Sequence, residues 1–230
     1  MERAIPVLPA DDLRVAKEFC VVVRFALVLV ITLAASASAQ AQVSVATVLP
    51  RDREFALALS AAPPDVGGKA AVYVFTSQGY EKAREGENGF TCLVNRDSEL
   101  EGYQVLKPTC WDAYGSRTIV PAILEIAKRR AAGQAVADVT AAIRQMIKDG
   151  ALQLFDSVGV AYMLAGDVAD YDAATGTIVK RAFPPHIMIY APGVTQNDVG
   201  LAGSAAFKDV RAPLIYQSAT GYRYLVVRVP

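Results

Sequence analysis

Histidine is nearly absent from this sequence, since His186 is the only one among 230 residues. Cysteine is also scarce, at three residues, and none has a second thiol close to it in the chain. Zinc sites take three or four His, Cys or carboxylate ligands, and thiol redox centres commonly use a CxxC pair. Asp167, Asp170 and Asp172 lie close together, but the glycine and terminal glutamate of a calcium-binding EF-hand are missing. We therefore predict no metal site.

Glycine-rich phosphate loops and an excess of positive charge are absent as well. The sequence contains no GxGxxG, Walker A or GxSxG pattern, so we expect no cofactor. Lys plus Arg number 23 and Asp plus Glu number 23, which gives a net charge of zero. The densest basic cluster, 128–130, falls at the end of a predicted helix, where cations interact favourably with the helix dipole. Proteins that bind nucleic acid normally carry a basic excess, so nucleic acid is not an expected partner.

What the chain does contain is a pattern typical of a secretory signal sequence, at 1–41. A basic residue precedes the apolar run 25–33, and the run gives way to alanine, serine and glutamine. Cleavage is expected after Ala39 or Ala41, which leaves 42–230 as a single domain, exported to the periplasm or secreted. A transmembrane helix needs roughly 20 apolar residues, so we expect no stable membrane span after cleavage.

The segment before the apolar run is unusual for a signal sequence. It is long and contains four acids against three bases ahead of Arg24. A start at Val22 or Val23 would leave a short basic segment before the run, so we predict that residues 1–21 do not belong to the native precursor. Cys20 precedes the apolar run and does not follow it, so we expect no lipoprotein anchor at this cysteine.

Cys92 and Cys110 are the cysteines left after signal cleavage, and an oxidising destination favours a disulfide between them. The bond would close a loop with 17 intervening residues. A loop of this length stabilises a fold by about 3 kcal/mol, because the unfolded chain loses entropy. The alternative is a free Cys92 nucleophile partnered by His186, as in thiol hydrolases, which requires Cys110 to stay unpaired.

A proline followed by acids and good helix formers predicts a short N-terminal helix at 51–61, and the alternation of Phe55, Leu57 and Leu59 leaves a strand as the alternative. Apolar periodicity predicts two central helices. The first central helix begins at Ser116 as its N-cap and ends before Gly133, and the second covers about 135–149. Strands and helices of this order indicate an α+β domain with a mainly antiparallel sheet. The predicted strands, which are apolar or β-branched runs between turn residues, are 70–76, 80–84, 90–94, 103–111, 160–164, 177–180, 186–190, 214–217 and 223–229.

The predicted strand 186–190 contains the only histidine and leads into a polar segment. Alternation along a strand places His186, Met188 and Tyr190 on one face. A carboxylate such as that of Asp198 could orient the imidazole, which would then act as a general base near neutral pH. His186, Asp198 and Tyr190 are therefore the candidate catalytic residues.

No catalytic motif supports this site, so the first hypothesis is a non-catalytic exported domain. Its expected partner is a small molecule or an envelope protein. The alternative is a periplasmic hydrolase that uses His186 as general base. The ten tyrosines are candidates for lining a binding groove, because a phenol combines apolar area with a hydrogen-bonding group.

Two segments carry a resemblance to a known group of proteins. Gly89-Phe-Thr-Cys-Leu-Val94 and Pro185-His186-Ile-Met-Ile-Tyr-Ala-Pro192 together resemble a pairing found in uncharacterised exported proteins of soil-type bacteria. The resemblance covers most of the mature domain. It implies export, and no activity follows from it.

Overall fold

The computed structural model of the chain describes residues 44–200 and 208–229. The predicted signal sequence and both predicted cleavage positions lie outside the described residues. Gln42–Pro230 clusters as one compact unit. Within the described ranges, no helix has the length and apolar character needed to cross a membrane.

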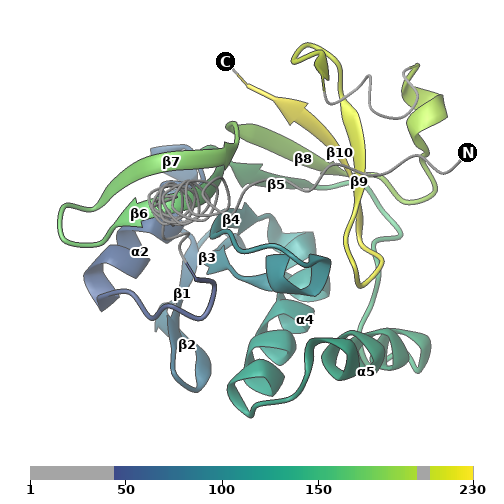
Figure 1. Cartoon of the computed structure of the whole chain (residues 1–230). Coiled ribbons are helices and arrows are strands. Elements are labelled where there is room, and N and C mark those ends of the chain that lie inside the picture. The colour runs from purple at the N-terminus through teal and green to yellow at the C-terminus, as the bar shows by residue number, and fades with distance from the viewer. Residues whose placement is uncertain (1–43, 201–207, 230) are drawn as a thin grey trace, which may run out of the picture. The chain divides into compact units, whose positions relative to one another are not determined.

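An eight-stranded sheet forms the centre of this unit, in the order β2-β1-β3-β4-β5-β8-β10-β9 (Figure 1). Neighbouring strands are antiparallel except β1 and β3, which are parallel. A separate hairpin consists of β6 (Asp167–Asp172) and β7 (Thr177–Phe183). The strands of the large sheet are β1 (Ala71–Thr76), β2 (Gly79–Arg84), β3 (Thr91–Asn95), β4 (Lys107–Trp111), β5 (Val160–Met163), β8 (His186–Tyr190), β9 (Leu214–Gln217) and β10 (Arg223–Arg228).

Helices cover both faces of the sheet. The α-helices are α2 (Arg51–Leu59), α3 (Pro64–Gly67), α4 (Ala113–Ala131) and α5 (Val136–Lys148), and the 3-10 helices are η1 (Asp97–Glu101) and η2 (Gln196–Val199). α4 and α5 lie side by side (Figure 1). One buried cluster joins them to Trp111 of β4, and a second cluster joins α2 to Cys110 of the same strand. Since successive strand residues point to opposite faces, α2 packs on one face of the sheet and α4 on the other.

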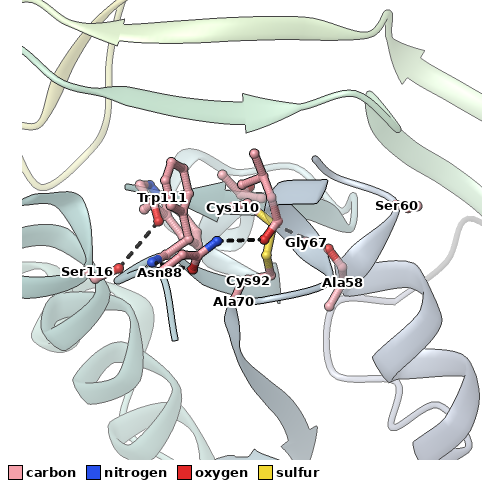
Figure 2. The surroundings of a disulfide bond; sticks show 12 residues. Ala58, Ser60, Gly67, Ala70, Asn88, Cys92, Cys110, Trp111 and Ser116 are labelled. Atoms are coloured by element: carbon pink, nitrogen blue, oxygen red, sulfur yellow. Dashed lines mark hydrogen bonds between the residues drawn. A yellow bond between two sulfur atoms is a disulfide. The ribbon is translucent and has the colours of Figure 1, made fainter. Parts of the chain in front are cut away.

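The disulfide between Cys92 and Cys110 is present on the α2 face (Figure 2). The two cysteines lie directly opposite each other on β3 and β4, with their Cα atoms 4.0 Å apart. Both side chains are fully buried, and the Cys110 sulfur lies 3.8 Å from the carbonyl oxygen of Ala58 in α2. The bond therefore joins neighbouring central strands, and it removes the free Cys92 thiol that a thiol hydrolase would need.

The α+β class, the short N-terminal helix, the two central helices and the mainly antiparallel sheet agree with the sequence prediction. The parallel pair of β1 with β3 makes the sheet mixed, because β2 pairs on the outer edge of β1 and the chain then enters β3 in the direction of β1. The acidic segment 167–172, which is not among the predicted strands, is the strand β6. Val168 is fully buried there and Asp172 pairs with Thr177 of β7.

The start of α4 is a second correction. The helix begins at Ala113, and its N-cap is Asp112, whose carboxylate accepts a hydrogen bond from the backbone N–H of Gly115 at 2.8 Å. The predicted cap, Ser116, lies inside the helix, and its hydroxyl donates to the carbonyl of Trp111 at 3.4 Å. An aspartate satisfies the free N–H groups of a first turn as well as a serine does, and here it comes one turn earlier.

Candidate functional site

A cavity of about 280 Å³ lies between η1, α4 and the sheet, and we call it the Lys107 cavity after the charged residue that lines it. Its strand walls come mainly from β4, β8, β9 and β10, and β3, β5, β6 and β7 contribute one residue each. Most of the lining is apolar or aromatic, and it includes Trp111, Ile119, Phe183, Met188, Leu214 and Tyr224. A concave, mostly apolar space with a few polar groups is the usual form of a small-molecule site.

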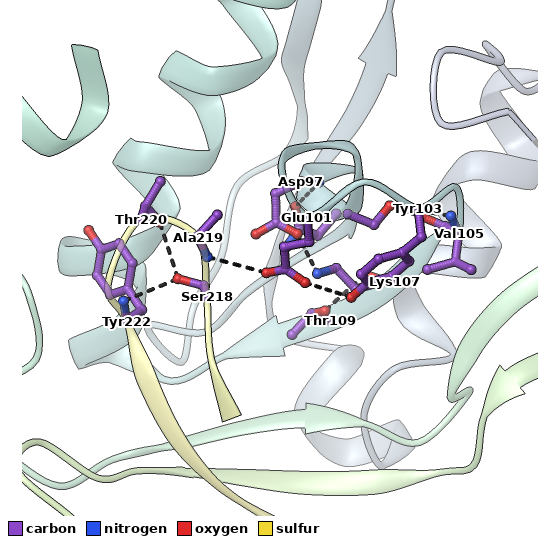
Figure 3. Close-up of polar contacts among 12 residues, drawn as sticks. Asp97, Glu101, Tyr103, Val105, Lys107, Thr109, Ser218, Ala219, Thr220 and Tyr222 are labelled. Carbon is purple, nitrogen blue, oxygen red and sulfur yellow. Dashed lines mark hydrogen bonds and ion pairs between the residues drawn. The ribbon is translucent and has the colours of Figure 1, made fainter. Parts of the chain in front are cut away.

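Lys107 and Asp97 form a buried ion pair at this cavity, with 2.5 Å between Nζ and Oδ1 (Figure 3). Lys107 is 6% exposed and Asp97 is 8% exposed. Burial alone disfavours the ammonium, but Asp97, the neighbouring tyrosines and Glu101 outweigh it, so the pKa of Lys107 is raised well above its ordinary value. Lys107 is therefore a permanent cation in the folded protein and is not available as a nucleophile.

Glu101 lies next to this pair and accepts three hydrogen bonds. The Tyr103 hydroxyl donates to Oε2 at 2.7 Å, and the backbone N–H of Ala219 donates to Oε1 (Figure 3). The Tyr216 hydroxyl also donates to Oε1. Burial, assisted by the nearby acids, raises the pKa of both phenols, so they keep their protons and act as donors. Both carboxylate oxygens of Glu101 thus accept hydrogen bonds, from β9, the β9–β10 turn and the segment after η1.

Asp167, the first residue of β6, also lines the cavity. Its burial raises the pKa of the carboxyl to about 6, and the negative charges of Asp97 and Glu101 act in the same direction against the opposing effect of Lys107. The Oδ1 atom is shielded from solvent and has no hydrogen-bond partner among the described residues. Asp167 Oδ1 is therefore an acceptor on the cavity wall to which a bound molecule could donate a hydrogen bond.

His186 lines the cavity as well, on the strand face that alternation predicted. Burial lowers the pKa of the imidazole from 6.5 to about 4, against a smaller opposing effect of its hydrogen bond to Pro184. The Pro184 carbonyl lies 2.8 Å from Nδ1 and can only accept, so Nδ1 carries the proton and Nε2 is left as an acceptor. The ring also makes an edge contact with Phe183, at 5.0 Å between centroids.

The other two candidate catalytic residues contact different partners. Tyr190 lies on the same face of β8, but its hydroxyl is 3.0 Å from both Asp112 Oδ1 and the Val160 carbonyl. Its ring stacks on Phe155 at 3.9 Å between centroids. A Cβ at position 115 would collide with the Tyr190 hydroxyl, which explains the glycine there. Tyr190 therefore anchors β8 to the start of α4.

Asp198 is exposed and belongs to a capping box at the start of η2. Its Oδ2 accepts hydrogen bonds from the Thr195 backbone N–H and hydroxyl, both at 2.7 Å, and these bonds lower the pKa of the carboxyl. No contact between Asp198 and His186 occurs in the described ranges. The carboxylates that line the cavity with His186 are those of Asp97, Glu101 and Asp167.

The sequence prediction found His186 but missed the charged residues around it. The sequence does hold a signal for Lys107 as a site residue. It is a lysine inside the predicted strand 103–111, with apolar neighbours and no acid within that strand. Asp97 and Glu101 fall in a segment interpreted as a simple connection, where acids are ordinarily solvated. Asp167 reaches the cavity from 60 residues beyond Lys107, and no local pattern signals such a contact.

Nothing in the described part of the chain groups three or more His, Cys, Asp or Glu side chains in a way that could hold a metal ion. Comparison with known proteins gives no matching family model, no matching curated protein and no matching solved structure. The resemblance to exported bacterial proteins stays a prediction. Function must therefore be argued from the cavity itself.

Proposed function

We propose that this protein is an exported domain that binds a small organic molecule in the Lys107 cavity and performs no catalysis on it. The observation that carries the proposal is the cavity, about 280 Å³ of space with apolar and aromatic walls and a few buried polar groups. The volume suits a molecule on the order of ten to fifteen non-hydrogen atoms, at the small end of ordinary ligand sites.

Export is part of the same proposal. The intramolecular disulfide favours an oxidising compartment, because thiols are kept reduced in the cytoplasm of most organisms. The predicted signal sequence at 1–41 supports the same destination. A periplasmic or secreted domain with a concave, mostly apolar cavity suits capture or carriage of a small solute better than docking to an envelope protein, which would use an exposed surface.

The two cysteines, Lys107 and His186 are poorly suited to attack or deprotonate a bound molecule, which favours binding over catalysis. Cys92 and Cys110 are bonded to each other, and Lys107 is held protonated by Asp97. His186 is neutral but weakly basic, since its pKa lies near 4 and an efficient general base has a pKa close to the working pH. The hydrolase alternative keeps two supporting observations: His186 lines the cavity, and so does the Asp167 carboxyl, whose pKa is about 6.

The binding proposal can be tested through Trp111, the single tryptophan of the chain, which is 1% exposed and lines the cavity. A fragment library is titrated against the purified protein while the Trp111 fluorescence is followed. We expect hits that shift or quench the emission, and we expect Val226→Phe to abolish them by filling the cavity. Val226 is a buried lining residue, so the added ring occupies space that a ligand would take.

Val227→Phe is the matched control. Val227 is the next residue of β10, is 38% exposed and lies outside the cavity lining. Its substitution should leave every hit unchanged. Hits that bind Val226→Phe as well as wild type would show that the molecules bind elsewhere, and the proposal would be wrong.

A further inference from the structure

We propose that the ligand of the Lys107 cavity is a small organic cation, an amine whose ammonium pairs with Asp167 and whose apolar body packs on the aromatic walls. This inference rests on the proposed binding function and adds the chemical class of the ligand. Three observations support it: the balance of charge in the cavity, the unfilled acceptor on Asp167, and the aromatic faces that already surround a cation.

The charges that line the cavity are mostly negative. Three carboxylates, those of Asp97, Glu101 and Asp167, face one ammonium, that of Lys107. Lys107 is already paired with Asp97 at 2.5 Å. His186 contributes no positive charge, because burial holds the imidazole neutral. An anionic ligand would meet an excess of like charge and no free cation, whereas a cation would reduce the excess.

Asp167 is the cavity carboxylate whose shielded oxygen has neither a hydrogen bond nor an ion pair among the described residues. Glu101 already accepts from Tyr103, Tyr216 and a backbone N–H, and Asp97 has Lys107. Asp167 Oδ1 has no donor among the described residues and is shielded from solvent. A buried acceptor without a donor costs free energy, and a charged donor supplies the strongest compensation. The ammonium of a ligand is such a donor.

The walls of the cavity have the chemistry that stabilises organic cations. The Lys107 ammonium lies 6.0 Å from the centroid of the Tyr103 ring and 5.9 Å from that of Tyr216. These distances are within the range in which the face of an aromatic ring attracts a cation. Trp111 and Phe183 line the same space and offer further ring surface to the body of a ligand. One buried cation is thus already accommodated here by carboxylate and phenol groups.

Three probes of matched size and shape test the inference. Binding of 2-phenylethylammonium, 2-phenylethanol and phenylacetate to the wild-type protein is measured by isothermal titration calorimetry at pH 7.5. The ammonium is expected to bind at least about tenfold more tightly than the alcohol, since a hydrogen bond between charged groups is worth about a tenfold or greater change in affinity. Phenylacetate is expected to bind most weakly.

The substitution Asp167→Asn tests the assigned carboxylate while keeping its shape. It should remove the tenfold preference for the ammonium and leave the affinity for 2-phenylethanol unchanged. Asp170→Asn is the matched control, because Asp170 belongs to the same strand and does not line the cavity. This control should keep the full preference.

The pH dependence of binding to the wild-type protein requires no variant. Asp167, with a pKa of about 6, is about nine-tenths protonated at pH 5, so the affinity for the ammonium should fall about tenfold between pH 7.5 and pH 5. The affinity for the alcohol should stay constant, because Asp97 remains paired with Lys107 and the imidazole of His186 remains largely neutral.

The outcomes separate the two proposals. If the alcohol or the carboxylate binds as tightly as the ammonium, or if Asp167→Asn keeps the preference, the cation is the wrong ligand class and the cavity remains a binding site. If none of the three probes binds at millimolar concentration while the fragment library gives hits that Val226→Phe abolishes, the cation proposal is wrong and the cavity remains a binding site. If the library gives no such hits either, both proposals are wrong.

Discussion

Replacing Lys107 by methionine should lower the free energy of unfolding far more than the loss of an exposed salt bridge would. Methionine matches the length of the lysine side chain and removes its charge. Asp97 would then be a buried carboxylate without a counter-charge, close to the carboxylates of Glu101 and Asp167.

The magnitude follows from the geometry of the pair. At 2.5 Å and an effective dielectric constant of about 20, two unit charges attract by roughly 7 kcal/mol. Most of this attraction is offset by the cost of taking two ions out of water, which is several kcal/mol for each. Lys107→Met removes the attraction but leaves the buried Asp97 carboxylate, so the expected loss is about 3 to 5 kcal/mol of unfolding free energy at pH 7.5.

Urea denaturation of wild type, Lys107→Met, Asp97→Asn and the double variant gives the four free energies of a double-mutant cycle. The double variant should be more stable than Lys107→Met, because it no longer contains the unpaired, buried Asp97 carboxylate. The loss in Lys107→Met should also shrink at pH 5, where Asp167 takes up a proton. A loss below about 1 kcal/mol at pH 7.5, or additive effects of the two substitutions, would refute this account of the pair.

Two further predictions concern the disulfide and the histidine. Replacing Cys92 and Cys110 together by alanine should lower the unfolding free energy by about 3 kcal/mol in urea; an unchanged midpoint would count against a stabilising bond. In an NMR titration, the single imidazole signal, that of His186, should show a pKa of about 4, and the free energy of unfolding should fall as the pH drops from about 6.5 toward 4, because the unfolded chain takes up this proton first. A measured pKa at or above 6.5 would instead favour the hydrolase with His186 as general base.

The fold was predictable wherever local pattern and tertiary environment agree. α4 and α5 carry apolar residues at spacings of three and four, as at Ile119, Ile123 and Ile126, and the same residues are buried against the sheet. β6 was missed because three aspartates obscure its pattern and only the neighbouring Val168 is fully buried. Its pairing with β7 supplies the backbone hydrogen bonds that the local sequence does not suggest.

The sequence alone predicted only those parts of the site that lie on one strand. Alternation placed His186 and Met188 on one face, and both line the cavity. The acids of η1 reach Lys107 because the chain reverses at Gly102, which has a φ of 84° and ends the 3-10 turn. Asp167 lies at the cavity because β6 pairs with β7 and because Val168 forms a β-bridge with Leu106. Contacts of this kind depend on the assembled fold, and no local spacing encodes them.

The most direct test of the binding site is a crystal structure of the protein with 2-phenylethylammonium. We expect the molecule inside the Lys107 cavity, with its ammonium about 3 Å from the Asp167 carboxylate and its ring against Trp111. An empty cavity in crystals grown with saturating 2-phenylethylammonium, or the molecule bound at another surface, would contradict the central claim that this cavity binds a small organic cation.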